Sequence, residues 1–161
     1  MSSLEPILGK LYYTIGLPRS GKSTYCDSWV DNGSLRVIVS SDDIRKSLHG
    51  QRYEPLAETM VFAIKHVMIR SLLSRGFDVI VDGTHSTKVS IQRLLEIDIN
   101  AIYIWMGTSP EECWRRAIKS NQFDLFNTIE RIHNNILKFQ EIGLDTFIEG
   151  IKKEIAGRGL F

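Results

Sequence analysis

Short apolar runs alternate along the chain with longer segments whose apolar residues recur at helical spacing. A short run that is apolar throughout its centre is typical of a strand buried on both faces of a parallel sheet. The runs lie at residues 11–15, 36–40, 78–82 and 101–106. Because strands that alternate with helices are joined by right-handed crossovers, the pattern predicts an α/β domain with a parallel sheet between layers of helices.

Helix limits are indicated by capping residues, glycines and prolines between the runs. The clearest start is Ser109-Pro110-Glu111-Glu112, in which an N-cap serine, a proline at the first helical position and a glutamate three residues after the serine form a capping box. Helices are expected at residues 22–31, 41–48, 55–75, 88–96, 110–120 and 127–142. In the third helix, an apolar stripe is expected to pack in the core, and it consists of Leu56, Met60, Ile64, Val67, Met68 and Leu72. Residues 146–149 are expected to form either a short last strand or a turn.

The first apolar run leads into a glycine-bounded polar loop and then into a predicted helix. Gly16-Leu17-Pro18-Arg19-Ser20-Gly21-Lys22-Ser23-Thr24 fits the phosphate-loop pattern G-x-x-x-x-G-K-[ST] in full. Gly21 lets the backbone curl so that successive N–H groups form an anion site, to which the following helix adds its positive dipole end. Lys22 can reach the outer phosphates, and the Ser23 hydroxyl is placed to hold Mg²⁺. The alternative is a chance match in an ordinary turn, which the flanking strand and helix signals disfavour.

The motif and the composition together define the expected class of protein. The 161 residues contain no linker or repeat, so we expect one domain over residues 1–161, with a lead-in at 1–10 and a loose tail at 156–161. Its expected fold class is the three-layer phosphate-loop NTPase fold, with a parallel sheet of four to five strands and helices on both faces. No guanine-reading Asn-Lys-x-Asp motif occurs, which favours ATP as the nucleotide.

Charge and cysteine content limit the partners and the compartment. The net charge of +1 argues against a surface that coats a bulk polyanion, although it leaves room for a local basic groove. The two cysteines, Cys26 and Cys113, suggest no disulfide framework and fit a reducing compartment. The sequence shows no signal peptide, and its longest apolar run is too short to cross a bilayer. We therefore expect a cytoplasmic protein with no membrane partner, and its oligomeric state is left open.

Acidic side chains follow the second and third apolar runs, at the sheet edge where the phosphate loop must also lie. Asp82 occupies the position where a phosphate-loop enzyme places an acid for Mg²⁺, although a turn or cap aspartate is the alternative. Asp42 leaves the second run beside the phosphate site, where a carboxylate can take the proton of an acceptor hydroxyl and orient its oxygen for in-line attack. Alternatively, Asp42 or Asp43 is the N-cap of the next helix. Arg45, one helical turn further, either holds a neighbouring anion in the same cleft or forms a local surface ion pair.

Three motifs together resemble the phosphate-loop kinases related to bacteriophage polynucleotide 5′-hydroxyl kinase, a group that includes zeta-toxin-like proteins. They are G-x-P-x-S-G-K-S-T, S-D-D-I-R and V-I-V-D-G-T-H, and the similarity covers roughly residues 11–120. The resemblance implies that Asp42 is the general base and that Arg45 contacts the phosphate next to the accepting 5′-OH. It also implies that Lys22 and Ser23 hold ATP and Mg²⁺.

This chain departs from its relatives after the third apolar run. Relatives often continue into Asp-Ala-Thr-Asn, whereas this chain has Asp82-Gly83-Thr84-His85. Thr84 matches the relatives, and Thr84 and His85 are both expected to bind the substrate. His85 replaces the amide, so it is either a substrate contact or only a polar loop residue.

The helix after the fourth run ends in a cluster of basic residues, which can be compared with the lid arginines of the relatives. They are Arg115, Arg116 and Lys119. The resemblance implies that Arg116 is a catalytic lid arginine that neutralises charge on the transferring phosphoryl group. The place of a second lid arginine is taken here by Ser120, for which Lys119 or Arg115 is a candidate substitute. A basic helix end favoured by the helix dipole is the alternative reading of those two residues.

Within the phosphate loop, Arg19 stands where relatives usually have glycine. A negative φ would be tolerated there, whereas a positive φ would cost on the order of 1 kcal/mol. The Arg19 charge reaches either over the bound nucleotide or out to solvent.

The leading functional hypothesis is an ATP-dependent kinase with Lys22, Asp42 and Arg116 as catalytic residues and the 5′-OH end of a polynucleotide as acceptor. A small-molecule or nucleotide kinase on the same scaffold shares all of these residues, and a non-kinase ATP-binding switch is the second alternative. A polynucleotide needs an open groove with basic and aromatic lining. Candidates for that lining are Arg45, Arg52, Tyr53, Lys88 and Arg93.

Overall fold

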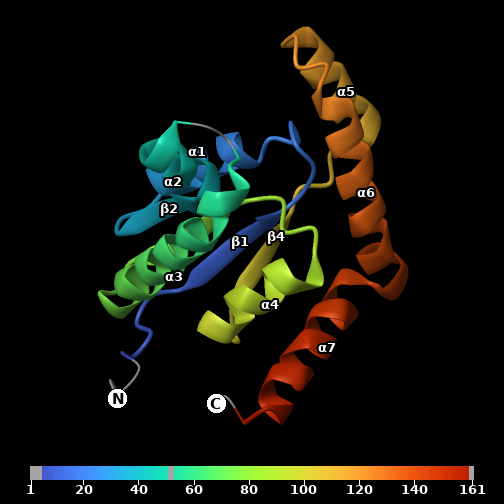
Figure 1. Ribbon diagram of the computed structural model, residues 1–161. Helices are drawn as coiled ribbons and strands as arrows, with labels where there is room; N and C mark the ends of the chain where they lie inside the picture. The colour runs from blue at the N-terminus through green and yellow to red at the C-terminus, as the bar shows by residue number, and fades with distance from the viewer. Residues whose placement is uncertain (1–4, 51–52, 160–161) are drawn as a thin grey trace.

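The strands form at the predicted runs. The computed structural model describes residues 5–50 and 53–159, and within them it forms β1 (Leu11–Ile15), β2 (Arg36–Ser40), β3 (Asp78–Asp82) and β4 (Ile102–Trp105). All pairings are parallel, and the sheet order is β2-β3-β1-β4. In this register Tyr13 of β1 lies between Val81 and Tyr103. The order places β1, which leads into the phosphate loop, at an interior position in the sheet (Figure 1).

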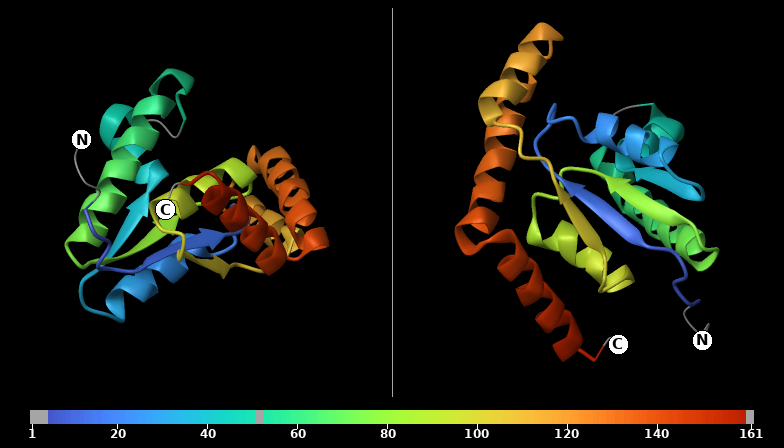
Figure 2. Two further views of the ribbon diagram at one scale, coloured as in Figure 1. Left: turned by 90° about the horizontal axis from the view of Figure 1, so that it is seen from below. Right: turned by 180° about the vertical axis from the view of Figure 1, so that it is seen from behind.

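Helices cover both faces of the sheet, so the prediction of a three-layer α/β fold is confirmed (Figure 2). The helices are α1 (Lys22–Asp31), α2 (Ser41–His49), α3 (Glu58–Ser74), α4 (Lys88–Ile97), α5 (Pro110–Lys119), α6 (Leu125–Ile142) and α7 (Leu144–Gly157), with a 3₁₀ turn at Pro55–Ala57 before α3. The helix α1 lies on one face, whereas α3 and α4 lie on the other, and α7 packs against α4. Within the described residues, none of the helices is long and apolar enough to span a membrane.

The core forms where the apolar strand centres meet the helices. Tyr13, Ile15, Val79, Ile80 and Val81 are fully buried, as expected for strands that are covered on both faces. Each such buried aliphatic side chain contributes about 1.5–3 kcal/mol through removal of apolar area from water. This rigid sheet fixes the loops that leave its carboxyl edge.

The segment 146–149 is helical, and its prediction as a short strand or a turn was wrong. Gly143, with φ of +95°, turns the chain between α6 and α7. Three isoleucines then recur at helical spacing on the buried side of α7: Ile148, Ile151 and Ile155. A four-residue stretch is too short to reveal that period, which needs two full turns. The helix runs to Gly157 and so includes the first two residues of the expected loose tail, and residues 160–161 lie outside the described part.

The buried side of α3 agrees only in part with the predicted stripe, of which Ile64 and Leu72 pack against the core. Leu56, Met60 and Val67 are 94%, 58% and 65% exposed, whereas Val61 and Ile69 are fully buried. Apolar side chains occur on more than one side of this helix, so their spacing alone does not define its inward face. The expected lead-in is attached to the same helix, because the N–H groups of Leu8 and Gly9 both donate to the carbonyl of Leu73 at 3.0 Å. Residues 1–4 lie outside the described part.

Candidate active site

The phosphate loop is shaped by two glycines. Gly21 caps α1 with φ of +98°, a conformation that strains any other residue. At Gly16 a Cβ atom would lie 2.7 Å from Met106 Cβ, so only glycine lets the loop approach β4 this closely. Thr108 Oγ1 donates to the carbonyl of Ser20 at 2.8 Å and fixes the loop from the other side. The N–H groups at the start of α1 have no partner within the helix and face outward, as an anion site requires.

Lys22 is held inside the loop. Its Nζ donates to the carbonyl of Leu17 at 2.5 Å and lies 3.5 Å from Ser20 Oγ. Burial lowers the pKa of this ammonium, and the nearby Asp82 carboxylate opposes that effect. A buried cation without a full counter-charge is stabilised by an anion, so Lys22 favours the binding of an anion at the loop.

Ser23 and Asp82 meet across the sheet edge. Ser23 Oγ donates to Asp82 Oδ2 at 2.8 Å, although the two residues are 59 positions apart. Two oxygen donors at this spacing fit Mg²⁺, which typically takes one or two protein oxygens and completes its octahedron with phosphates and water. Within residues 5–50 and 53–159 no group of three or more His, Cys, Asp or Glu side chains could hold a metal.

Asp42 is exposed at the end of β2. The N-cap of α2 is Ser40, whose Oγ accepts from the Asp43 N–H at 3.3 Å, so Asp42 is not needed as a cap. The Asp42 side chain is 64% exposed and accepts from Arg45 Nη1 at 2.8 Å. The Asp42 carboxylate is therefore accessible from solvent as well as bonded to Arg45.

Arg45 is clamped by Glu58, a residue that the sequence analysis missed. Its Nε and Nη2 donate to the two Glu58 oxygens at 2.9 and 2.6 Å. This bidentate pair is largely buried, raises the pKa of Arg45 and lowers that of Glu58. The clamp ties α2 to α3 and holds the Arg45 group that orients Asp42. Glu58 carried no recognisable signal, since it lies in the first turn of a helix where acids are common.

Arg116 and Arg19 lie over the phosphate loop. Arg116 Nη1 donates to the carbonyl of Arg19 at 3.1 Å, and its Nε donates to Glu112 at 2.9 Å. Arg19 adopts a positive φ of +66°, and its Nη2 donates to Ser120 Oγ at 2.8 Å. Together they enclose a cavity of about 290 Å³, which is lined by Arg19, Gly21, Lys22, Ser23, Thr24 and Arg116. Two arginines thus line the cavity beside the phosphate loop.

The other basic candidates in this part of the chain are engaged elsewhere or exposed. Arg115 is paired with Glu112 at 2.7 Å and is 63% exposed. Lys88 is paired with Glu154 of α7 at 2.9 Å, away from the phosphate loop. Tyr53 is exposed, and its ring lies 6.0 Å from the Arg45 guanidinium carbon, on the acceptor side. Arg52 lies outside the described residues.

Thr84 is half-buried, and the neighbouring His85 is buried. The carbonyl of Thr84 accepts from the Gly16 N–H at 3.2 Å, which attaches this loop to the phosphate loop. The His85 side chain is 4% exposed, and its Nδ1 lies 2.6 Å from the Thr14 carbonyl. Because a carbonyl only accepts, Nδ1 carries the proton. Burial and the positive charge of Lys65 lower the pKa of His85 to about 3, so the ring is neutral.

The buried ring does not present a polar edge to a substrate, and its place depends on Gly83. A Cβ atom at Gly83 would lie 2.9 Å from His85 Cε1. The ring also packs edge-on against Tyr13, with centroids 5.6 Å apart. His85 therefore positions the loop between β3 and α4 against β1.

The comparisons with known proteins place these features in context. Residues 11–137 match the model of a protein family described as an AAA domain. Among curated proteins, no sequence matches this chain.

Solved structures share the fold. A chain of the Pnkp1/Rnl/Hen1 RNA repair complex matches with a TM-score of 0.67 and 21% identity, over 83% of this chain and 47% of that chain. The Mycobacterium tuberculosis APS kinase CysC in complex with AMPPNP and APS matches with a TM-score of 0.57 and 17% identity, over 70% of each chain. Shikimate kinase from Acinetobacter baumannii in complex with shikimate matches with a TM-score of 0.52 and 17% identity, over 89% and 80%. This chain spans about half the length of the RNA repair chain, with 47% of it covered.

Proposed function

Because the chain belongs to the AAA domain family and has a phosphate-loop kinase fold, we propose that it is an ATP-dependent kinase that phosphorylates the 5′-OH end of a polynucleotide. One observation carries the proposal. The exposed Asp42 carboxylate is fixed by the Arg45–Glu58 clamp at the same sheet edge as the cavity that contains Lys22 and Arg116. This arrangement supports Asp42 as a proton acceptor that works opposite a phosphate site.

The residues of the chain take distinct parts in the transfer. Asp42 accepts the proton of the acceptor hydroxyl and orients its oxygen toward the γ-phosphorus. The new P–O bond forms as the bond from the γ-phosphorus to the bridging oxygen breaks, and ADP leaves with that electron pair. Lys22 and Arg116 stabilise the charge on the phosphoryl oxygens. Mg²⁺, held by Ser23 and Asp82, would neutralise charge on the β- and γ-phosphates.

The choice of acceptor rests on the resemblance and on the similarity to a chain of an RNA repair complex. The rival is a kinase of small molecules, since APS kinase and shikimate kinase have the same fold. Both use the same donor site. They differ in whether the acceptor continues beyond the hydroxyl that lies at Asp42.

The test offers ATP labelled at the γ-phosphate to four acceptors in parallel: 5′-OH DNA and 5′-OH RNA oligonucleotides, 3′-nucleotides and free nucleosides. Label on the oligonucleotides is expected. Asp42→Ala should abolish transfer and spare ATP binding, whereas Asp43→Ala, a neighbouring exposed acid, should retain transfer. Label on nucleosides alone would replace the polynucleotide by a small acceptor. ATP binding without transfer to any of the four would favour a switch protein.

A further inference from the structure

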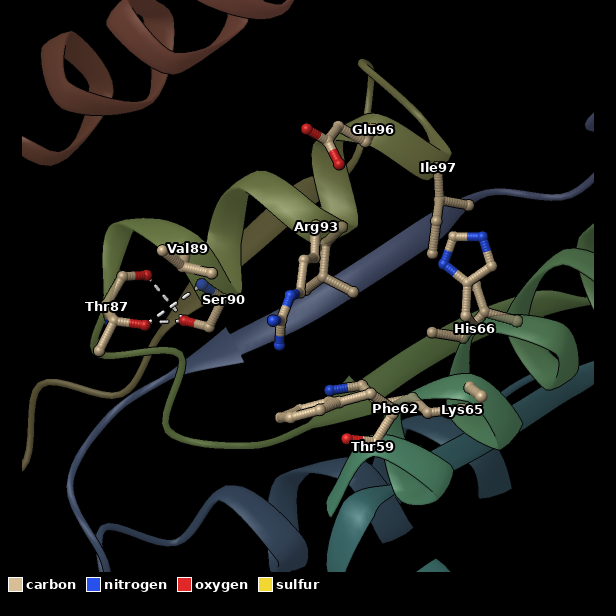
Figure 3. A pocket seen from close by; sticks show the side chains of 13 residues that line it. Thr59, Phe62, Lys65, His66, Thr87, Val89, Ser90, Arg93, Glu96 and Ile97 are labelled. Carbon is tan, nitrogen blue, oxygen red and sulfur yellow. Dashed lines mark hydrogen bonds between the residues drawn. The ribbon is translucent and has the colours of Figure 1, made fainter. Parts of the chain in front are cut away.

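A second cavity of about 500 Å³ lies between α3 and α4, apart from the phosphate loop (Figure 3). Side chains from both helices form its walls, among them Phe62, Lys65, His66, Thr87, Ser90 and Arg93. Figure 3 shows Thr87 and Ser90 at the end toward which β1 points, which is the carboxyl edge of the sheet. The groove therefore runs over the sheet face and ends on the side where the active-site loops lie.

The groove holds two cations that have no acidic partner. Within residues 5–50 and 53–159, neither Lys65 nor Arg93 forms an ion pair or a hydrogen bond. The acid in the lining, Glu96, is already bonded to Gln92 at 3.0 Å and to Arg158 at 3.4 Å. The wall is thus electropositive without internal compensation.

Lys65 makes this arrangement costly for the free protein. It is partly buried beside apolar groups, and burial together with the charges of Arg45 and Arg93 lowers its pKa to about 8. An ammonium in such a place destabilises the fold unless an anion accompanies it. A ligand that brings negative charge would remove this cost.

The aromatic wall adds a second preference. The guanidinium carbon of Arg93 lies 4.4 Å from the centroid of the Phe62 ring, and Figure 3 shows the two reaching toward each other across the groove. Phe62 is 38% exposed, and Ile69 and Leu94 form an apolar floor. A flat ring stacks favourably on an aromatic or guanidinium face, and the hydroxyls of Thr59 and Thr87 can bond polar edges. A ligand that combines a planar ring with an anionic group would fit both preferences of the groove, and a nucleotide has both.

The position of Arg45 connects the groove to the active site. Arg45 is bonded to Asp42 at 2.8 Å, and its charge also acts on Lys65. Its partner Glu58 begins α3, the helix that carries Phe62 and Lys65 one and two turns further along the same side. Arg45 is therefore bonded to Asp42 and close enough to the groove for its charge to act on Lys65.

We propose that the groove between α3 and α4 binds a nucleotide unit of the acceptor, with its phosphate on Lys65 and Arg93 and its base against Phe62. The proposal rests on the proposed kinase function and extends it from the reacting hydroxyl to the body of the substrate. The same chemistry is present in an oligonucleotide and in a free 3′-nucleotide, so the test includes both.

Binding is measured first, without turnover, by calorimetry at one fixed salt concentration. The probes are a 5′-OH oligonucleotide, a nucleoside 3′-phosphate and the corresponding nucleoside. Lys65→Met and Arg93→Gln should each raise the Kd of the two phosphate-containing probes at least about tenfold, as expected for loss of one charge-assisted contact. The nucleoside and ATP should bind as before. Lys88→Met, which removes an equal charge from α4 outside the groove, should leave all four affinities unchanged.

Turnover then separates the groove from the kinase assignment. In both variants the KM for the oligonucleotide should rise while kcat at saturation is retained. If the variants bind and turn over oligonucleotide like wild type while Asp42→Ala abolishes transfer, the groove proposal is wrong and the kinase stands. If no acceptor is phosphorylated but the variants still lose nucleotide binding, the kinase assignment fails and the groove stands. If Lys88→Met loses as much affinity as the groove variants, the effect is one of overall protein charge, and the groove proposal is wrong.

Discussion

The Arg116 guanidinium on α5 donates to the main-chain carbonyl of Arg19 in the phosphate loop at 3.1 Å. The bond fixes the guanidinium above the cavity that Lys22 and Ser23 line. It uses one N–H group of Arg116, and another is bonded to Glu112 at 2.9 Å, so further donors remain for phosphate oxygens.

Arg116→Ala is therefore expected to lower kcat by about 10²–10³-fold, the range for loss of one preorganised donor to developing charge. Its Kd for ATP should change much less, because the loop N–H groups and Lys22 remain. Single-turnover kinetics and ATP binding measure the two effects. Arg115→Ala, which removes the adjacent exposed arginine, is the control, and equal losses in both would contradict the assignment.

The backbone of Arg19 is strained, and we expect the Arg19 charge to contribute to activity in compensation. A non-glycine residue in the left-handed region costs about 1–2 kcal/mol, and Arg19 has φ of +66°. Arg19→Gly should therefore leave the free energy of unfolding equal or higher, while kcat falls at least about tenfold. Ser120→Ala keeps the charge but removes its 2.8 Å bond and should cost less activity. Full activity in Arg19→Gly would show that the charge points to solvent.

Gly83 and His85 should be coupled energetically. A Cβ at position 83 would lie 2.9 Å from the His85 ring, which is buried and cannot swing out cheaply. Gly83→Ala should destabilise the protein by about 1–3 kcal/mol through overpacking. His85→Asn offers a smaller side chain that tolerates positive φ and can still donate to the Thr14 carbonyl. In the double variant most of the Gly83→Ala penalty should disappear, and denaturant unfolding of all four proteins measures the coupling. Additive penalties would contradict it.

Lys65 predicts a defined pH dependence of stability. Its pKa is about 8 in the folded protein and 10.5 when unperturbed. Between these values the unfolded chain binds more protons, so stability rises with pH, and the full penalty is present below pH 8. Lys65→Met should be more stable than wild type at pH 7 by roughly 1–3 kcal/mol, and the difference should shrink between pH 8 and 10.5. A difference that stays constant over this range would show that the ammonium is not destabilised.

The clamp on Arg45 predicts a positioning role for Glu58. Glu58→Gln keeps the shape but removes the charge that holds Arg45 at 2.6 Å. The Asp42–Arg45 pair should then become mobile, and kcat should fall about 10-fold with ATP affinity unchanged. Glu54→Gln, at an acid just before α3, is the control. Unchanged kcat in Glu58→Gln would show that Asp42 is oriented without the clamp.

Local signals in the sequence were sufficient for the strands and for the donor site. The limits of β1, α1, β2 and β3 match the predicted ones, because each is set by a continuous apolar run or by a glycine-bounded motif. Ser23 and Asp82 were also predicted to lie at one edge, since parallel strands end on the same side. These features depend on neighbouring residues or on topology alone.

Side-chain contacts between different elements of the fold could not be predicted in the same way. The Arg45–Glu58 clamp and the burial of His85 depend on how two elements approach, which no periodicity records. The inward side of α3 was predicted only in part, since Ile64 and Leu72 pack against the core while Leu56, Met60 and Val67 are exposed. Several sides of this helix are apolar, and packing decides which of them is buried. The α7 helix was missed where the window was shorter than the period it had to detect.

The strand order β2-β3-β1-β4 also sets the distance between Asp42 and the phosphate loop. The acid leaves β2 and the phosphate loop leaves β1, so the width of β3 separates proton acceptor from donor site. Two interstrand steps amount to roughly 10 Å. In the proposed reaction this gap would be occupied by the hydroxyl oxygen, the phosphoryl group that is transferred, and the side chains of Asp42 and Lys22. If Asp42 is the proton acceptor that we propose, the length of this gap limits which substrates fit. Lengthening the acid in Asp42→Glu should then misplace the hydroxyl even though the charge and acidity of the carboxyl group are kept.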